Sequence, residues 1–120
     1  MNELDLESRN LLQAIVKGIE EKKGKNTIVL ELSELEHAIA DYYVICEGDS
    51  TTQTYALYGS VEHEVRKALD ERPYRSEGQQ NAEWIILDYV SVVVHILLPE
   101  AREFYRLESV WADAVVVTLE

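Results

Sequence analysis

The sequence predicts an α/β fold in which helices flank a mixed β-sheet. Two long segments, one near the N-terminus and one in the middle of the chain, have apolar residues at helical spacing. Four short segments are rich in β-branched and aromatic residues, which is typical of strands. No Pro/Gly-rich linker separates them, so we expect a single domain over residues 1–114 and a C-terminal tail at 115–120.

The first half of the chain is expected to form one helix and two strands. The helix is predicted over residues 6–23, and Gly24 follows it at the position of a C-cap glycine. Strands are predicted at 26–32 and 42–48. The segment 33–41 between them is compatible with either a short helical turn or a loop.

The second long helix is predicted over residues 49–71. Ser50 and Gln53 have the S-x-x-Q spacing of a capping box, which satisfies free N–H groups at a helix start. Residues 72–82 then cross to the next strands.

A β-hairpin and a short helix complete the predicted fold. Residues 83–89 and 92–98 are separated only by the turn at Val90-Ser91, so they are expected to pair antiparallel. Pro99 begins a short helix over 99–105, at a first-turn position where its missing N–H costs nothing.

The hairpin register decides which side chains share a face, because side chains alternate along a strand. With a two-residue turn, Ile86 pairs with His95 and Trp84 pairs with Leu97. One face is then continuously apolar, made by Ile85, Leu87, Tyr89, Val92, Val94 and Ile96. The second face of the hairpin mixes apolar and titratable side chains: Trp84, Ile86, Asp88, Val93, His95 and Leu97.

Two interpretations of this second face remain open from the spacing. Tryptophan and large aliphatic residues beside polar groups are typical of protein-binding patches. Alternatively, a helix covers the face, and His95 is a buried, hydrogen-bonded histidine, for which a carboxylate is one candidate partner.

The charge of the chain favours basic partners. Its formal net charge is −12 and its pI is near 4.6. Such a field repels phosphate backbones, so we expect no direct nucleic-acid binding. It attracts basic proteins, although from the charge alone solubility is the stronger explanation of the acidity.

Several classes of protein are disfavoured by what the sequence contains. No segment approaches the roughly 18 apolar residues that span a bilayer, so no membrane association is expected. The single cysteine, Cys46, indicates a reducing, cytoplasmic environment. His37, His63 and His95 fall in three different elements and have no metal-ligand spacing. We therefore expect no catalytic residues, no metal and no cofactor.

Three motifs resemble the ribosomal silencing factor family, also called Iojap. They are "DYYVICEGDSTTQ" from Asp41, "EG" at Glu77-Gly78, and "EWIILDYVSVVVHILLPEAREFYRLESVWADA" from Glu83. The last is the most specific, because it keeps the family spacing of Trp84, Asp88, His95, Arg102, Tyr105, Leu107, Glu108 and Trp111. The chain departs from the family pattern in two places: Val90-Ser91 stands where the family usually has Gly-Asp, and Ala112 where it usually has glycine.

The resemblance implies a nucleotidyltransferase-like fold without the catalytic signature, and a protein that is not an enzyme. Proteins of this family bind the large ribosomal subunit through ribosomal protein L-fourteen and sterically block joining of the small subunit, which represses translation. Their contact includes the tryptophan of the first hairpin strand, here Trp84. The resemblance thus implies a partner-binding site on the second face: Trp84, Ile86, Asp88, Val93, His95 and Leu97.

Three other functions stay open. Organelle relatives act in large-subunit biogenesis, so an assembly factor is one alternative. An unrecognised nucleotidyltransferase-like enzyme using Asp41, Asp49 or Asp88 is another. A homodimer that uses the Trp84 face is a third.

Overall fold

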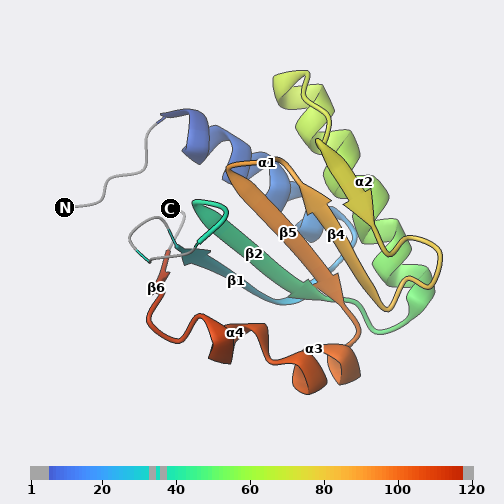
Figure 1. Ribbon diagram of the computed structural model, residues 1–120. Helices are drawn as coiled ribbons and strands as arrows, with labels where there is room; N and C mark the ends of the chain where they lie inside the picture. Colours follow the sequence, from blue (N-terminus) through green and yellow to red (C-terminus); the bar gives the residue numbers. More distant parts are fainter. Residues whose placement is uncertain (1–5, 33–34, 36–37, 118–120) are drawn as a thin grey trace.

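The computed structural model of the protein describes residues 6–32, 35 and 38–117. This part of the chain contains both helices and strands, as Figure 1 shows. The elements are α1 (Leu6–Glu21), β1 (Lys25–Glu31), β2 (Tyr42–Glu47), α2 (Thr51–Leu69), β3 (Arg75–Glu77), β4 (Trp84–Asp88), β5 (Val92–Leu97), α3 (Pro99–Tyr105), α4 (Leu107–Val110) and β6 (Val115–Val116).

The strands form one six-stranded mixed sheet in the order β3-β4-β5-β2-β1-β6. The pairing of β2 with β5 is parallel, and the other pairings are antiparallel. Helices α1 and α2 cover one face of the sheet, whereas α3 and α4 lie along its lower border in the view of Figure 1. The predicted α/β fold with a mixed sheet and flanking helices is confirmed.

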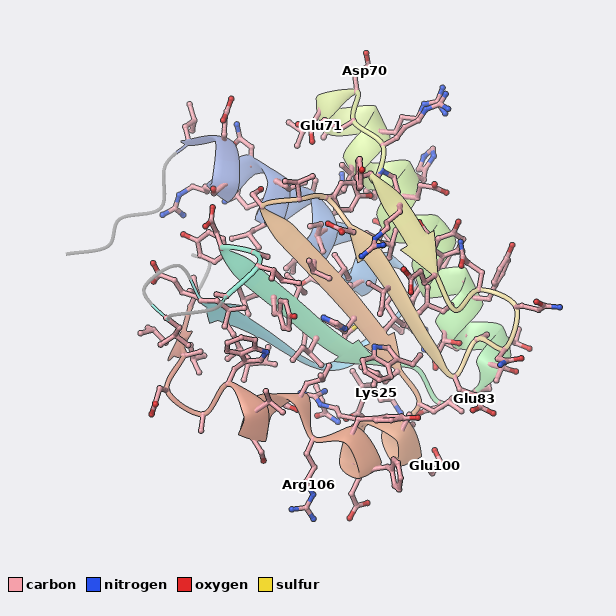
Figure 2. The ribbon with its side chains drawn as sticks, in the orientation of Figure 1. Lys25, Asp70, Glu71, Glu83, Glu100 and Arg106 are labelled. Carbon is pink, nitrogen blue, oxygen red and sulfur yellow. The ribbon has the colours of Figure 1, made fainter. Side chains whose placement is uncertain are left out.

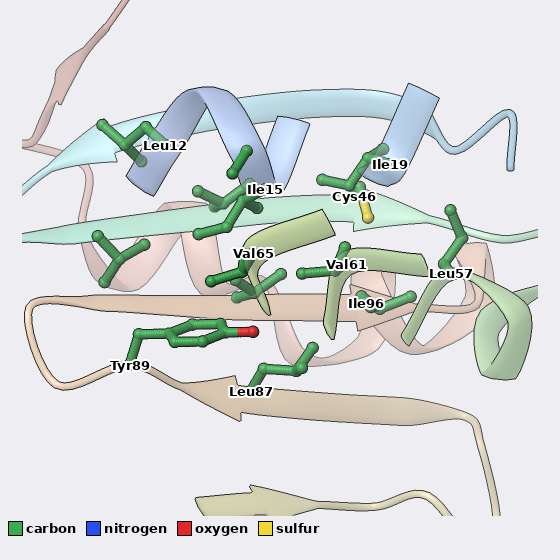
Figure 3. Close-up of a cluster of buried hydrophobic side chains, with 14 of the residues drawn as sticks. Leu12, Ile15, Ile19, Cys46, Leu57, Val61, Val65, Leu87, Tyr89 and Ile96 are labelled. Carbon is green, nitrogen blue, oxygen red and sulfur yellow. The ribbon is translucent and has the colours of Figure 1, made fainter. Parts of the chain in front are cut away.

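The hairpin of β4 and β5 has the predicted register. Trp84 pairs with Leu97 and Ile86 pairs with His95. The apolar face packs into the main core beneath α1 and α2, where Leu87 and Tyr89 meet Ile15, Val61 and Val65 (Figure 3). Cys46 belongs to the same core, and burial raises the pKa of its thiol to about 12, so it is a packing residue and not a thiolate.

The two long helices approach each other closely where α1 has a glycine. A Cβ atom at Gly18 would lie 2.7 Å from the Cα atom of Val61, so the contact requires the absence of a side chain. The Ser60 hydroxyl donates to the Gly18 carbonyl at 2.8 Å across this contact. Glycine and serine at the crossing therefore set how tightly α1 and α2 cover the sheet.

The end of the first helix differs from the prediction. Helix α1 ends at Glu21, and the left-handed conformation expected at Gly24 is adopted by Lys23, whose φ is 61°. Gly24 is needed for space, because a Cβ atom there would lie 2.5 Å from the Ile19 side chain.

The start of α2 is capped, with one difference from a standard capping box. Ser50 accepts a hydrogen bond from the Gln53 N–H at 3.1 Å, as predicted. The Gln53 side chain accepts from the N–H of Asp49 and donates to the carbonyls of Lys22 and Lys23. The same glutamine thus joins the start of α2 to the end of α1.

Three short elements were not predicted. Strand β3 lies within the predicted crossing segment 72–82, and α4 follows α3. Strand β6, in the segment predicted as a tail, pairs with β1, so these residues extend the sheet at its edge. In the ambiguous segment 33–41, residues 33–34 and 36–37, which include His37, lie outside the described residues.

Candidate partner-binding site

The second face of the hairpin is partly covered. Val93, His95 and Leu97 are buried, with exposures of 7%, 4% and 0%, so the expectation that all six residues are open to solvent is wrong for these three. Trp84, Ile86 and Asp88 are partly exposed.

The cover comes from the C-terminal segment, which we define as residues 99–114. Its apolar side chains Ala101, Leu107 and Trp111 pack against the cluster that contains Val93 and Leu97. Ala101 lies on α3, Leu107 begins α4 and Trp111 follows α4. The left-handed backbone of Arg106, with a φ of 51°, turns the chain between the two helices.

His95 is held by Trp84 and not by a carboxylate. The indole N–H of Trp84 donates to Nδ1 of His95 at 3.0 Å, and the ring of Tyr43 lies 4.5 Å away, centroid to centroid. Burial lowers the pKa of His95 to about 4, so the ring is neutral at physiological pH. Nε2 of this buried ring has no hydrogen-bond partner among the described residues.

A hollow of about 130 Å³ opens beside His95 on the second face. Ile86 and Val93 contribute apolar walls, and Asp88 and Arg75 contribute charge. Asp88 already accepts a hydrogen bond from the Val90 N–H at 2.8 Å and lies 3.5 Å from the Arg75 guanidinium. Its first role is therefore to hold the hairpin turn.

The family motif residues in the C-terminal segment hold that segment in place. Arg102 donates to Glu108 at 2.5 Å, to Glu47 at 3.1 Å and to the Asn26 carbonyl at 2.6 Å. Burial acts to raise the pKa of Glu108, but the hydrogen bond and charge of Arg102 outweigh it, so that pKa is lowered. One partly buried guanidinium thus joins α3 and α4 to β1 and β2.

The exposed part of the second face continues into neighbouring segments and forms with them a longer apolar strip. Phe104 packs edge-on against Tyr105 at 5.0 Å, and Tyr105 lies 4.6 Å from Trp84. Ile86 and Ile39 line the hollow together, and Ile39 and Val90 line a second, neighbouring hollow. We define the apolar strip as Phe104, Tyr105, Trp84, Ile86, Ile39 and Val90.

Four members of the apolar strip were missed by sequence reasoning. Phe104, Tyr105, Ile39 and Val90 are exposed, with Ile39 at 81% and Phe104 at 78%. The adjacent aromatic residues in "REFY" were the available signal for two of them, since consecutive aromatics on a short helix cannot both face the core. Ile39 and Val90 lie in connecting segments, where spacing gives no such signal.

Acidic residues border the strip where it passes Trp84. Glu83 and Glu100 are exposed and lie at the lower edge of the molecule in Figure 2, beside the N-terminus of α3. Lys25, labelled nearby, is paired with Asp49 at 2.6 Å. The border of the strip beside Trp84 is therefore suited to a basic partner.

Two of the three carboxylates considered for catalysis lie far from each other. Asp41 and Asp49 lie beyond opposite ends of β2, on the order of 20 Å apart along an extended strand. Across residues 6–32, 35 and 38–117, no group of three His, Cys, Asp or Glu side chains could hold a metal ion. In the same part of the chain, none of the helices is long and apolar enough to cross a membrane.

Comparison with known proteins agrees with these features. Residues 5–120 match the family described as "Ribosomal silencing factor during starvation". The ribosomal silencing factor RsfS of Halalkalibacterium halodurans is 34% identical over 118 residues, which cover 96% of this chain and 97% of that protein. A mouse protein named "Mitochondrial assembly of ribosomal large subunit protein 1" is 28% identical over 83% of this chain and 44% of its own length.

The fold is also shared with a solved structure. A crystal structure of a protein from Chromobacterium violaceum superposes with a TM-score of 0.82 and 30% identity, covering 91% of this chain and 88% of that one. The family match spans the hairpin with Trp84 and His95 as well as the C-terminal segment that covers it. The chain therefore belongs to the ribosomal silencing factor family.

Proposed function

We propose that this protein binds the large ribosomal subunit through ribosomal protein L-fourteen and sterically blocks joining of the small subunit. The observation that carries the proposal is the apolar strip. It offers exposed aromatic and aliphatic side chains in one continuous surface, and such surfaces on otherwise well-packed proteins mark interaction sites.

The charge of the molecule supports a protein partner on the ribosome. A chain of net charge −12 is repelled by ribosomal RNA, so its contact has to be a basic protein that is exposed on the subunit surface. Glu83 and Glu100 beside the strip would face the basic residues of that protein. Association of this kind should be faster at low salt.

Co-sedimentation with separated large subunits, separated small subunits and joined ribosomes tests the proposal. The protein should sediment with large subunits and should be absent from joined ribosomes, and it should reduce the fraction of subunits that join. Sedimentation with small subunits, or equal sedimentation with joined ribosomes, would contradict a steric block.

A role in large-subunit assembly is the second candidate function, favoured by the name of the mouse relative. An assembly factor should sediment with immature large-subunit precursors and should be displaced from the mature particle. Comparing the two particles in the same gradients separates this role from silencing. A homodimer through the strip would instead compete with subunit binding, which sedimentation at increasing protein concentration would reveal.

A further inference from the structure

The His95 hollow lies at the centre of the second face and is lined in part by a buried histidine. His95 is 4% exposed and is one of the residues that line the hollow. Its Nδ1 accepts the Trp84 indole N–H at 3.0 Å, and an N–H group can donate only to an unprotonated nitrogen. The neutral ring therefore carries its proton on Nε2, which has no acceptor among the described residues.

Buried donors are nearly always paired in folded proteins, so this one indicates a partner beyond the described residues. Water is one possible occupant. However, the hollow measures about 130 Å³, whereas one water molecule in the liquid occupies about 30 Å³, so the space admits a whole side chain.

The groups around the hollow restrict which side chain it accepts. Lysine and arginine have donors only and cannot accept the Nε2–H proton. A carboxylate would be repelled by Asp88 and Glu77, which line the same hollow, and Arg75, the cation in that lining, is already paired with both of them. A neutral side chain with both an acceptor and a donor meets both demands, because it can accept from His95 and donate to Asp88.

We propose that the His95 hollow is an anchor pocket that receives one neutral polar side chain, a carboxamide or a hydroxyl, from the bound partner. This inference rests on the proposed function and adds to it a contact that does not depend on charge. The basic residues of the partner would then lie around the pocket, beside the acidic border, and not inside it.

Two variants test the pocket from this side of the interface. His95→Phe removes the donor and keeps an aromatic ring, and Ile86→Phe leaves the donor but fills the hollow. Each should weaken binding to purified large subunits by about tenfold. The matched control is Ile28→Phe, since Ile28 is also partly buried against the same apolar cluster but does not line the hollow.

An NMR measurement remains informative if a variant fails to fold. In the full chain with ¹⁵N-labelled histidine, the free protein should show a protonated Nε2 and an unprotonated Nδ1 for His95. Addition of isolated ribosomal protein L-fourteen should shift the Nε2–H resonance and slow its exchange with water.

The outcomes separate the inference from the proposed function. If wild-type protein binds large subunits, yet His95→Phe and Ile86→Phe bind equally well and the Nε2–H signal does not move, the pocket holds water only and the inference is overturned. If wild-type protein binds neither large subunits nor isolated ribosomal protein L-fourteen, the proposed function fails, and the inference fails with it.

Discussion

Trp84 and His95, on adjacent strands of one hairpin, are joined by a hydrogen bond from the indole N–H to Nδ1 at 3.0 Å. The bond fixes the orientation of the imidazole ring and places the tryptophan between His95 and Tyr105. Trp84 and His95 therefore form one unit, in which the buried histidine supports the partly exposed tryptophan.

This unit predicts an acid-dependent loss of stability. Burial lowers the folded-state pKa of His95 from 6.5 to about 4, so its neutral form is favoured by folding. The contribution is complete above pH 6.5 and is lost as the pH falls from 6.5 toward 4, because only the unfolded chain takes up the proton. The full loss is on the order of 3 kcal/mol.

Urea unfolding of wild-type protein and of His95→Phe at several pH values between 7 and 4 measures this effect. The other charged groups that line the hollow, Asp88, Glu77 and Arg75, are present in both proteins, so their contributions cancel in the comparison. The stability difference between the two should therefore change in favour of the variant as the pH falls. Parallel curves would show that His95 titrates normally and is not buried as described.

Gly78 fixes the backbone of Trp84, which explains the Glu77-Gly78 motif. Its φ is +86°, and a Cβ atom at this position would collide with the Trp84 carbonyl oxygen. Gly78→Ala should lower the free energy of unfolding by roughly 1–3 kcal/mol. Gly59→Ala is the matched control: nothing lies near that glycine on α2, so the change should stabilise by about 0.5–1 kcal/mol. Equal effects would contradict this role for Gly78.

Val90 occupies a strained position in the hairpin turn. Its φ is +75°, unusual for a β-branched residue, and the Ser91 N–H donates back to the Tyr89 carbonyl at 2.9 Å, which makes a tight γ-turn. Val90→Gly should raise the free energy of unfolding by about 0.5–1 kcal/mol in chemical denaturation, because strain relief exceeds the added flexibility of the unfolded chain. Val90→Ala keeps a Cβ atom and should gain less. If the alanine variant is as stable as the glycine variant, the turn is not strained at this residue.

Arg102 should be essential for the cover over the second face. Arg102→Met leaves Glu47 without its cation in a site where both side chains are mostly buried, so we expect a loss of about 2–3 kcal/mol. The control is Lys25→Met, which removes an exposed pair with Asp49 and should leave stability almost unchanged. Trp111 belongs to the C-terminal segment, and Trp84 contacts Tyr105 of that segment. The fluorescence of both tryptophans therefore reports detachment of the segment. A loss of stability no larger than that of the control would contradict this role of Arg102.

The sequence predicted the sheet and the hairpin register because both depend on local periodicity. Alternation along residues 84–97 determined which side chains share a face, and the paired residues agree. It could not predict how far the C-terminal segment covers the second face, since that depends on a turn at Arg106 and on the long-range contact of Arg102 with Glu47. For the same reason the exposed residues Ile39 and Tyr105 were not among the predicted site residues. The partner-binding role of the six predicted residues stays a prediction.

The most direct test of the central claim compares two tyrosines of nearly equal exposure. Tyr105 in the apolar strip is 50% exposed, and Tyr55 on α2, beneath the opposite face of the sheet, is 53% exposed. Co-sedimentation with large ribosomal subunits should fall at least about tenfold for Tyr105→Ala and stay at the wild-type level for Tyr55→Ala, with both variants folded by circular dichroism. Unchanged binding of Tyr105→Ala, or equal losses for the two variants, would contradict a docking surface on this face.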